Sequence, residues 1–467
     1  MRRYNRTTYL AIGCLSVLSG IGATRLISVS HDYIWLAASL SAVFMFRRNA
    51  LLLSISLGMT IGLWRGDIYL QKFQALQKLD GQKISLIVKV TQDAIYGTNQ
   101  QLDFTANSAR LQSGKVLAGN LKISGFGPAM VYRGDTVKVS GKLYPASGTY
   151  QARVSYAQLE RLSDDRGVIN NFTRRLSSGM QNALPEPNAS FGLGLLIGQR
   201  NNLPTDLYQK LIMVGLVHIV AVSGYNLTIL VRAAGRLKLF SKYQQLILSL
   251  ALIVVFLMMT GFSASIVRAA IVSALSLWAW FYGRKVPAML ILAFTAALTG
   301  LINPFYVWGD LGWYLSFLAF FGILIISPIL SARFFKRQPK LLAATALETF
   351  CAELMALPFI MLMFGQLSLI GLIANVLVVP LIPLAMLLSA VAAFVGSLAP
   401  SIAGWVAWPA NWLLTYILDL IRWFASLPGI FQKRTIGLAV MLGFYAVLGA
   451  ILLIIRRHKS GKAPVAS

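Results

Sequence analysis

Long apolar runs separated by short basic segments make up most of this 467-residue chain. A helix needs about 20 apolar residues to cross the hydrocarbon core of a bilayer, and several runs reach that length. Spans are predicted near 8–28, 33–46, 50–63, 207–230, 244–262, 266–282, 286–302, 311–330, 342–364, 368–395, 402–427 and 436–455. We therefore expect a polytopic α-helical membrane protein with about twelve spans, some of them broken or re-entrant.

Lys and Arg gather in alternate loops between these runs, which sets the predicted orientation because cytoplasmic loops are enriched in them. Both termini then lie in the cytoplasm, and the third span ends on the outer face near Arg65. The pair Lys433-Arg434 is the exception, since it falls outside.

Between Gly81 and Leu162 the long apolar runs give way to short stretches in which apolar and polar residues alternate. Short alternating runs at 83–90, 101–104, 120–124 and 135–141, separated by Gly, Asn and Pro, are typical of half-buried strands. Four or five strands of this length suit a small OB-like β-barrel inserted outside the membrane, although periodicity does not separate it from other small barrels.

Apolar residues then recur at about four-residue spacing from Val168 to Leu184, which predicts an amphipathic helix at the membrane surface. The Pro-Glu-Pro sequence that follows ends it. The predicted organisation is N-terminal transmembrane helices (1–66), an extracytoplasmic OB-like β domain (67–165), an amphipathic interfacial helix (166–187), a second transmembrane domain (188–456) and a cytoplasmic tail (457–467).

Composition agrees with a membrane protein, because 57% of the residues are hydrophobic, only 12% are charged and the mean hydropathy is +0.67. Charge adds a second question. The chain has 42 Lys and Arg against 15 Asp and Glu, a net charge of +27. Either the positive-inside rule or a polyanionic partner such as nucleic acid accounts for this excess.

The predicted β domain carries ten basic and four acidic residues between Gly81 and Leu162, on a side where the positive-inside rule does not apply. Aromatic residues lie among them, a combination that suits single-stranded nucleic acid. The alternative is that the aromatics form the barrel core and the lysines solvate it. The candidate DNA-binding residues are Lys83, Lys89, Arg110, Lys122, Tyr132, Arg133, Lys138, Lys142 and Tyr144.

Polar residues also interrupt several predicted spans, where they are costly unless they face protein or water. Arg268 could snorkel to the interface, and Asp310 could simply cap a helix at the outer surface. A polar path through the membrane is the preferred interpretation. The candidate channel-lining residues are His218, Ser223, Asn226, Arg268, Asp310 and Asn375.

The sequence offers no signal for a cofactor, a metal or a catalytic residue. Cys14 and Cys351 lie in separate apolar runs, the three histidines are scattered, and no phosphate-binding Gly-x-x-x-x-Gly-Lys-Ser/Thr loop is present. We therefore predict that the protein is not an enzyme.

Four blocks occur in the order found in ComEC-type competence proteins: His218–Leu230, Thr-Gly-Phe-Ser with Arg268-Ala269, Asn303-Pro304 with Asp310 and Leu315-Ser316, and Phe364-Gly365 with Asn375 and Pro380. The chain resembles this family over nearly its whole length. The resemblance implies that residues 188–456 form a channel carrying one strand of incoming DNA across the cytoplasmic membrane during natural transformation. Because no nucleotide-binding loop is present, the driving force must come from a cytosolic ATP-driven motor or from the membrane potential, and we expect a DNA receptor as a further partner.

The chain departs from the family pattern in three places. Tyr225-Asn226 stands where many relatives have Leu-His, and the Gln of a Gly-Phe-Gln-Leu-Ser motif is replaced by Tyr314. Many relatives also carry a C-terminal metallo-β-lactamase-like domain, and no His-x-His-x-Asp cluster occurs in this sequence. The resemblance therefore implies a separate protein as the nuclease.

Two other functions remain open. A small-molecule or lipid transporter would also have broken helices, but it would not need a basic external barrel. A membrane-embedded hydrolase could use His218 and Ser223 with Asp310 or Glu353. A separation of five residues would, however, turn His218 and Ser223 to different sides of a helix.

Overall fold

The computed structural model describes residues 5–26, 31–46, 49–97, 101–111, 114, 116–117, 119–128, 130–146, 150–163, 167–199, 203–220, 227, 231, 241–335, 339 and 341–460. The chain divides into two compact units. The first contains Met1–Leu176 and Leu227–Trp313, and the second contains Ser177–Asn226 and Tyr314–Ser467.

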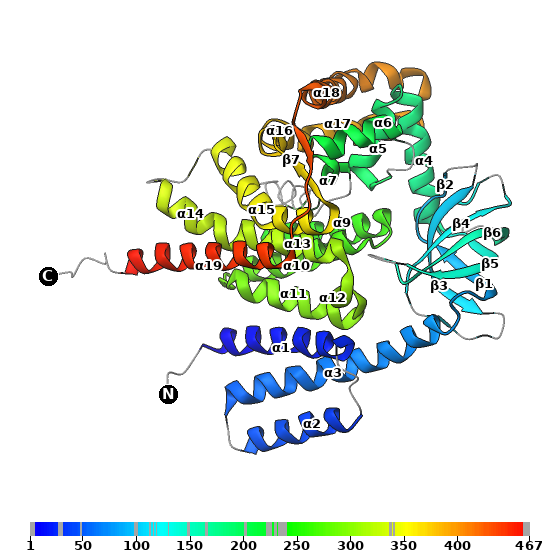
Figure 1. The fold of residues 1–467 in the computed structure, drawn as a ribbon. Coiled ribbons are helices and arrows are strands. Elements are labelled where there is room, and N and C mark those ends of the chain that lie inside the picture. Colours follow the sequence, from blue (N-terminus) through cyan, green and yellow to red (C-terminus); the bar gives the residue numbers. More distant parts are fainter. Residues whose placement is uncertain are drawn as a thin grey trace. The chain divides into compact units, whose positions relative to one another are not determined.

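The helices of the first unit are α1 (Arg6–Leu26), α2 (His31–Phe46), α3 (Ala50–Gln77), α9 (Lys242–Thr260), α10 (Ala264–Phe281), α11 (Ala288–Ile302) and α12 (Phe305–Gly309) (Figure 1). The third predicted span, 50–63, is longer than expected, because α3 continues beyond the apolar run to Gln77 and leads into the first strand.

A glycine face brings α1 and α3 into backbone contact. Gly58, Gly62 and Gly66 recur every four residues on α3, which places them on one side of the helix. A Cβ atom on Gly20 of α1 would lie 2.6 Å from the carbonyl oxygen of Met59. Small residues at such a spacing let membrane helices approach closely, so the pair is held by van der Waals packing along its length.

Five long strands close into a ring. The strands are β1 (Lys83–Val90), β2 (Ile95–Tyr96), β3 (Leu102–Leu111), β4 (Leu121–Phe126), β5 (Thr136–Pro145) and β6 (Ala152–Ser163). β1 pairs with β3 and β5, β3 with β4, β5 with β6, and β4 with β6 in parallel, while β2 extends one edge at β3. Alternate residues point into an apolar core, as the period-two pattern predicts.

The elements of the second unit are α5 (Asn188–Ile197), α6 (Thr205–Met213), α7 (Val217–Val220), η2 (Gly322–Ile326), α14 (Ser327–Phe334), α15 (Leu341–Phe364), β7 (Gln366–Ser368), α16 (Gly371–Val378), η3 (Val379–Leu381), α17 (Ile382–Leu398), α18 (Pro400–Ser426), β8 (Phe431–Lys433) and α19 (Leu438–Ser460). The chain passes between the units within α4 (Val168–Ala183), between Asn226 and Leu227, and within α13 (Leu311–Phe321). The amphipathic period from Val168 therefore does form a helix.

Eight helical segments among the described residues are long and apolar enough to cross a membrane. They begin at Arg6, Ala50, Lys242, Ala264, Leu311, Ala343, Gly371 and Leu438. The other four predicted spans correspond to α2 and α11, which are short, to 207–230, which breaks after α6, and to α18, which is long but less apolar. The count of twelve spans stays a prediction.

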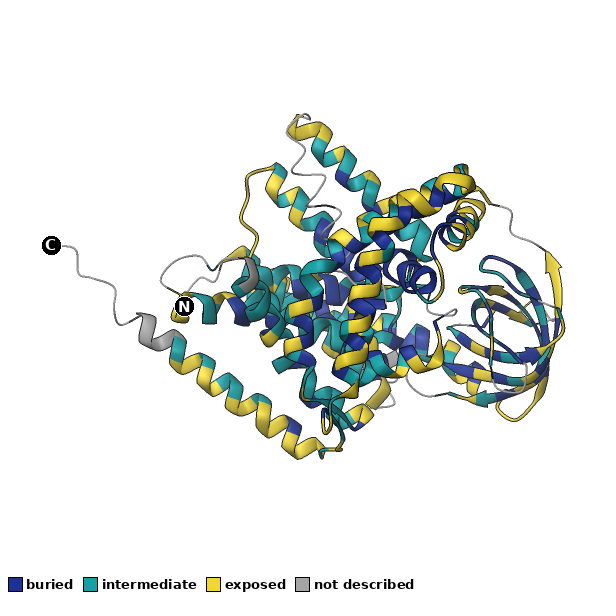
Figure 2. Cartoon of the chain, turned by 90° about the horizontal axis from the view of Figure 1, so that it is seen from above, coloured by how far each residue is buried: buried dark blue, intermediate teal, exposed yellow. Residues whose placement is uncertain are grey.

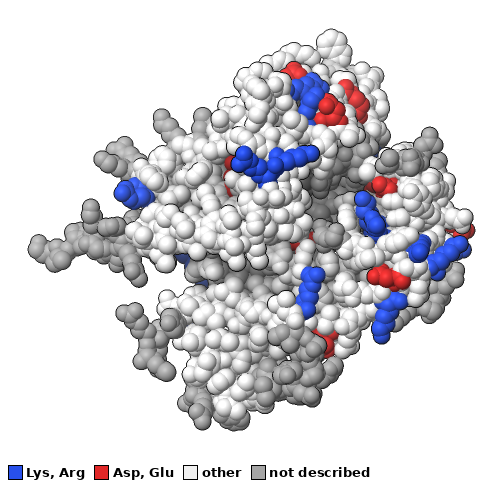
Figure 3. All heavy atoms as spheres, in the orientation of Figure 1, with Lys and Arg blue, Asp and Glu red and all other residues white. Residues whose placement is uncertain are grey.

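Large apolar side chains are exposed on most of these helices, for example along α17 and α19 (Figure 2). On the face drawn in Figure 3, wide areas over the helices carry neither Lys and Arg nor Asp and Glu. Soluble proteins rarely expose apolar surfaces of this extent, whereas a surface that contacts lipid is apolar. The molecule is a multi-pass membrane protein with a separate small β-sheet domain.

Replacing Gly62 by Leu should force α1 and α3 apart, because a Cβ there collides with the carbonyl oxygen of Val17. We expect a loss of about 1–3 kcal/mol in stability, measured as thermal unfolding of the detergent-solubilised protein. Gly22→Leu on α1 is the control, since nothing lies within 4 Å of its Cβ position. An equal loss for both variants would contradict this account of the packing.

Candidate nucleic-acid interface

The registers of the β-sheet domain place five residues in one outward-facing row, here called the basic row: Lys83, Lys142, Tyr144, Arg153 and Lys122. Lys83 of β1 lies opposite Lys142 of β5, and Arg153 of β6 lies between Tyr144 of β5 and Lys122 of β4. The strand neighbours on both sides are buried for Lys122, Lys142 and Arg153, and Ile84 and Leu143 are buried beside Lys83 and Tyr144, so alternation turns all five outward.

The row combines cations with an aromatic face. The Lys142 Nζ and the Arg153 guanidinium each lie 5.6 Å from the centre of the Tyr144 ring. Within the described part of the chain, none of the four cations of the row forms an ion pair with a carboxylate. The row therefore offers uncompensated positive charge beside a ring, as backbone attraction and base stacking require.

Other predicted DNA-binding residues make contacts within the protein. Lys138 pairs with Glu160 at 3.2 Å, and the Arg174 guanidinium lies 4.7 Å from the centre of the Tyr132 ring. Lys89 and Arg110 are exposed on β1 and β3, away from the basic row. Arg153 was not among the predicted residues; its alternation with buried Val154 is the signal that could have found it.

Arg133 holds the end of a membrane helix. Its two terminal nitrogens donate to the carbonyl oxygens of Met258 and Met259 at 2.5 Å, in the last turn of α9. Asp93 accepts the Arg133 backbone N–H at 2.7 Å. Gly261 follows α9 with φ +75°, and a Cβ there would lie 2.9 Å from the Arg133 Cζ. Arg133 thus attaches the β-sheet domain to α9.

Asp135 makes a second attachment. Its side chain is fully buried, and it lies 3.3 Å from Arg174 of α4 and 3.7 Å from Arg161 of β6. It also accepts the backbone N–H of Tyr132 at 3.0 Å, which closes the turn that presents Arg133. These charges stabilise the docking of α4 and are not part of the exposed row.

Arg268 and Asp310 come together in the helices of the first unit, each only 2% exposed. The Arg268 Nη2 donates to the Gly312 carbonyl at 3.0 Å, and the Asp310 carboxylate attracts the guanidinium electrostatically. The Arg268 Nε and Nη1 have no hydrogen-bond partner among the described residues. Arg268 therefore does not snorkel to a surface, and part of its donor capacity is unused.

Asp310 does cap a helix, because its Oδ1 accepts the backbone N–H of Trp313 at 2.6 Å in the first turn of α13. The cap is buried rather than at the outer surface. The Trp313 indole in turn donates to the Thr299 hydroxyl at 3.0 Å, which fixes α13 against α11.

The second unit contains the remaining predicted channel residues. Asn375 is buried on α16 and donates to Glu353 of α15 at 2.8 Å and to the Gly371 carbonyl at 3.0 Å. His218 is exposed on the short helix α7, after a break at Gly215 with φ +78°. Ser223 and Asn226 lie outside the described residues.

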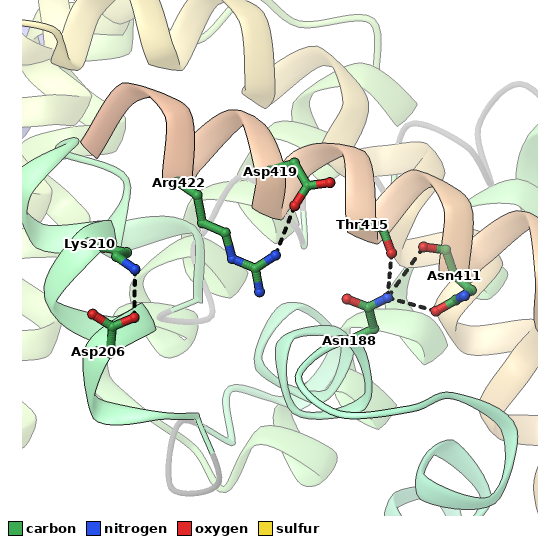
Figure 4. A network of polar contacts seen from close by, with 7 residues as sticks. All are labelled: Asn188, Asp206, Lys210, Asn411, Thr415, Asp419 and Arg422. Carbon is green, nitrogen blue, oxygen red and sulfur yellow. Dashed lines mark hydrogen bonds and ion pairs between the residues drawn. The ribbon is translucent and has the colours of Figure 1, made fainter. Parts of the chain in front are cut away.

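Sequence reasoning missed a further buried amide, Asn188, at the first residue of α5. Its side-chain nitrogen donates to the side-chain oxygens of Asn411 and Thr415 on α18, each at 2.7 Å (Figure 4). The pairs Lys210–Asp206 and Arg422–Asp419 lie on helices of the same unit but do not join this network. Asn188 fixes α5 to α18, which is a structural role.

The described residues thus define a multi-pass helical membrane protein with a β-sheet domain that presents cations and an aromatic ring. Residues 195–458, more than half of the chain, match the family described as Competence protein. The chain belongs to the competence protein family.

The chain is also similar to the ComE operon protein 3 of Bacillus subtilis (strain 168). The two are 26% identical over 230 residues, which cover 48% of this chain and 28% of that protein. No solved structure matches the chain.

Asp310→Asn should keep the cap on α13, since the amide oxygen can still accept from Trp313, but it leaves Arg268 uncompensated. We expect a loss of stability in thermal unfolding of the solubilised protein, because the buried guanidinium would remain without a nearby opposite charge. The double variant Asp310→Asn/Arg268→Met should recover part of this loss because it also removes the lone charge. Additive losses would show that the two residues are not coupled.

Proposed function

We propose that this protein is a channel that carries single-stranded DNA across the cytoplasmic membrane during natural transformation, and that its β-sheet domain binds the incoming strand on the outer side. The basic row is the observation that carries the proposal. It supplies positive charge for phosphates and a ring for a base, and both kinds of contact are independent of the base sequence.

The strand order of the β-sheet domain supports an OB-like interpretation. Counting only the long strands, the ring runs first, second, third, fifth, fourth and back to the first, with a parallel pair between third and fifth. OB-fold domains bind oligonucleotides over their second and third strands and the loops beside them, including the loop between the fourth and fifth. Tyr144 and Arg153 flank that loop here.

The helical part supplies the conduit in this proposal. Arg268 offers two donors that no described residue uses, and a phosphate is a suitable acceptor for them. His218, Ser223, Asn226, Asp310 and Asn375 would line the same polar path. The function calls for a cytosolic ATP-driven motor, a DNA receptor and a nuclease for the strand that does not enter.

Changing Lys122 and Arg153 together to Ala should weaken binding of single-stranded DNA to the full-length protein in nanodiscs. Each lost phosphate contact should also reduce the slope of log affinity against log salt by about 0.7. Fluorescence anisotropy at several salt concentrations measures both. Lys138→Ala is the matched control, because Glu160 already neutralises that lysine. A double variant with wild-type affinity and slope would remove the basic row from the proposal.

Transport itself can be measured with the protein in lipid vesicles. A labelled single strand should become protected from external nuclease, whereas a duplex of equal length should not, because its bases are hidden from stacking residues. Protein-free vesicles give the background. Equal protection of both substrates, or of neither, would argue against a single-strand channel.

A further inference from the structure

A recess of about 440 Å³ lies where the β-sheet domain, the start of α4 and the end of α9 meet, all within the first unit. Lys89 and Asn107 line it from the sheet, Arg133 from the turn that follows, and Phe262 from the α9–α10 turn. The volume falls within the range of small-molecule sites, and the lining combines positive charge, an amide and an aromatic ring.

Phe262 adopts a backbone conformation that few residues of its size adopt. Its φ is +55°, in the left-handed region, where a bulky side chain is strained. Its N–H donates to the Leu257 carbonyl at 3.0 Å, after the left-handed Gly261. In such helix ends an apolar residue at this position usually packs back onto the helix, but Phe262 is 59% exposed. The strain is therefore not offset by burial of the ring.

The surrounding contacts keep Phe262 in this conformation. Arg133 holds the carbonyls of Met258 and Met259, and the absent side chain of Gly261 makes room for its guanidinium. Strained residues persist where neighbouring structure over-determines them, and they collect at binding sites. The α9–α10 turn is thus fixed with a largely exposed phenylalanine side chain.

The chemistry of the recess selects the ligand. An exposed ring offers a stacking surface to any base, and Lys89 offers attraction to a phosphate. Arg133 adds positive charge even though its donors serve α9. The recess therefore suits a ligand that has both an aromatic ring and an anionic group on a flexible backbone. A nucleotide of a single strand has all three.

We propose that this recess holds one nucleotide of the incoming strand, with its base stacked on Phe262 and its phosphate beside Lys89. The inference rests on the proposed function and adds to it a defined contact at the junction of the β-sheet domain and the membrane helices. Phe262 lies in the Thr-Gly-Phe-Ser block, and the inference gives this residue a binding role.

Substitutions at Phe262 test the stacking contact in the full-length protein in nanodiscs. Phe262→Leu keeps an apolar side chain but removes the ring, so affinity for an ordinary oligonucleotide should fall by about tenfold. Phe262→Tyr should bind like the wild type. An oligonucleotide of abasic spacers should bind the wild type and Phe262→Leu equally, because it has no base to stack.

Phe262→Gly separates strain from binding. Glycine adopts a positive φ freely, so this variant should melt at a higher temperature than the wild type while binding DNA as weakly as Phe262→Leu. If the Phe262 side chain only anchored the turn in lipid, Phe262→Leu should bind DNA as tightly as the wild type.

The outcomes distinguish this inference from the proposed function. The stacking contact is wrong, and the proposed function stands, if the wild type binds DNA and Phe262→Leu binds it equally well. The same conclusion follows if Phe262→Leu loses as much affinity for the abasic strand as for the ordinary one. If the wild type shows no salt-dependent binding of single strands, the proposed function fails and this inference fails with it.

Discussion

The last carbonyl groups of a helix have no backbone donor, and in the first unit arginine side chains supply one. Arg133 donates at the end of α9, Arg65 at the end of α11 and Arg25 at the end of α12. Positive charge is also favourable at this end of a helix dipole. These contacts tie α1, α3 and the β-sheet domain to helices far away in sequence and so join the parts of the first unit.

This arrangement changes the meaning of the excess positive charge. Part of it is consumed inside the protein, by helix ends and by the buried carboxylate of Asp135. The four cations of the basic row remain exposed on the β-sheet domain, beside a ring and without acidic partners among the described residues, while Lys89 and Arg110 are exposed elsewhere on it. Net charge alone could not separate these two groups of residues, because a cation that caps a helix and an exposed cation look the same in a sequence.

Local patterns predicted the elements well. The apolar runs at 244–262 and 266–282 match α9 and α10 within two residues, and the period of two predicted β1 at its observed bounds. Pairings between distant segments could not be predicted. Nothing local indicates that Met258 lies beside Arg133, whose assignment to DNA stays a prediction. Alternation with Val154 shows that Arg153 faces outward, but its place in the basic row depends on strand register. Asp310 was correctly offered as a helix cap, but its burial beside Arg268 depends on how the helices pack.

The grip of Arg133 on α9 has a mechanical consequence. The two hydrogen bonds from the planar Arg133 guanidinium to successive carbonyls must break together when the β-sheet domain is pulled away from α9. They therefore resist this force better than two bonds that break one after the other. Tension applied to the β-sheet domain is therefore transmitted directly to a membrane helix.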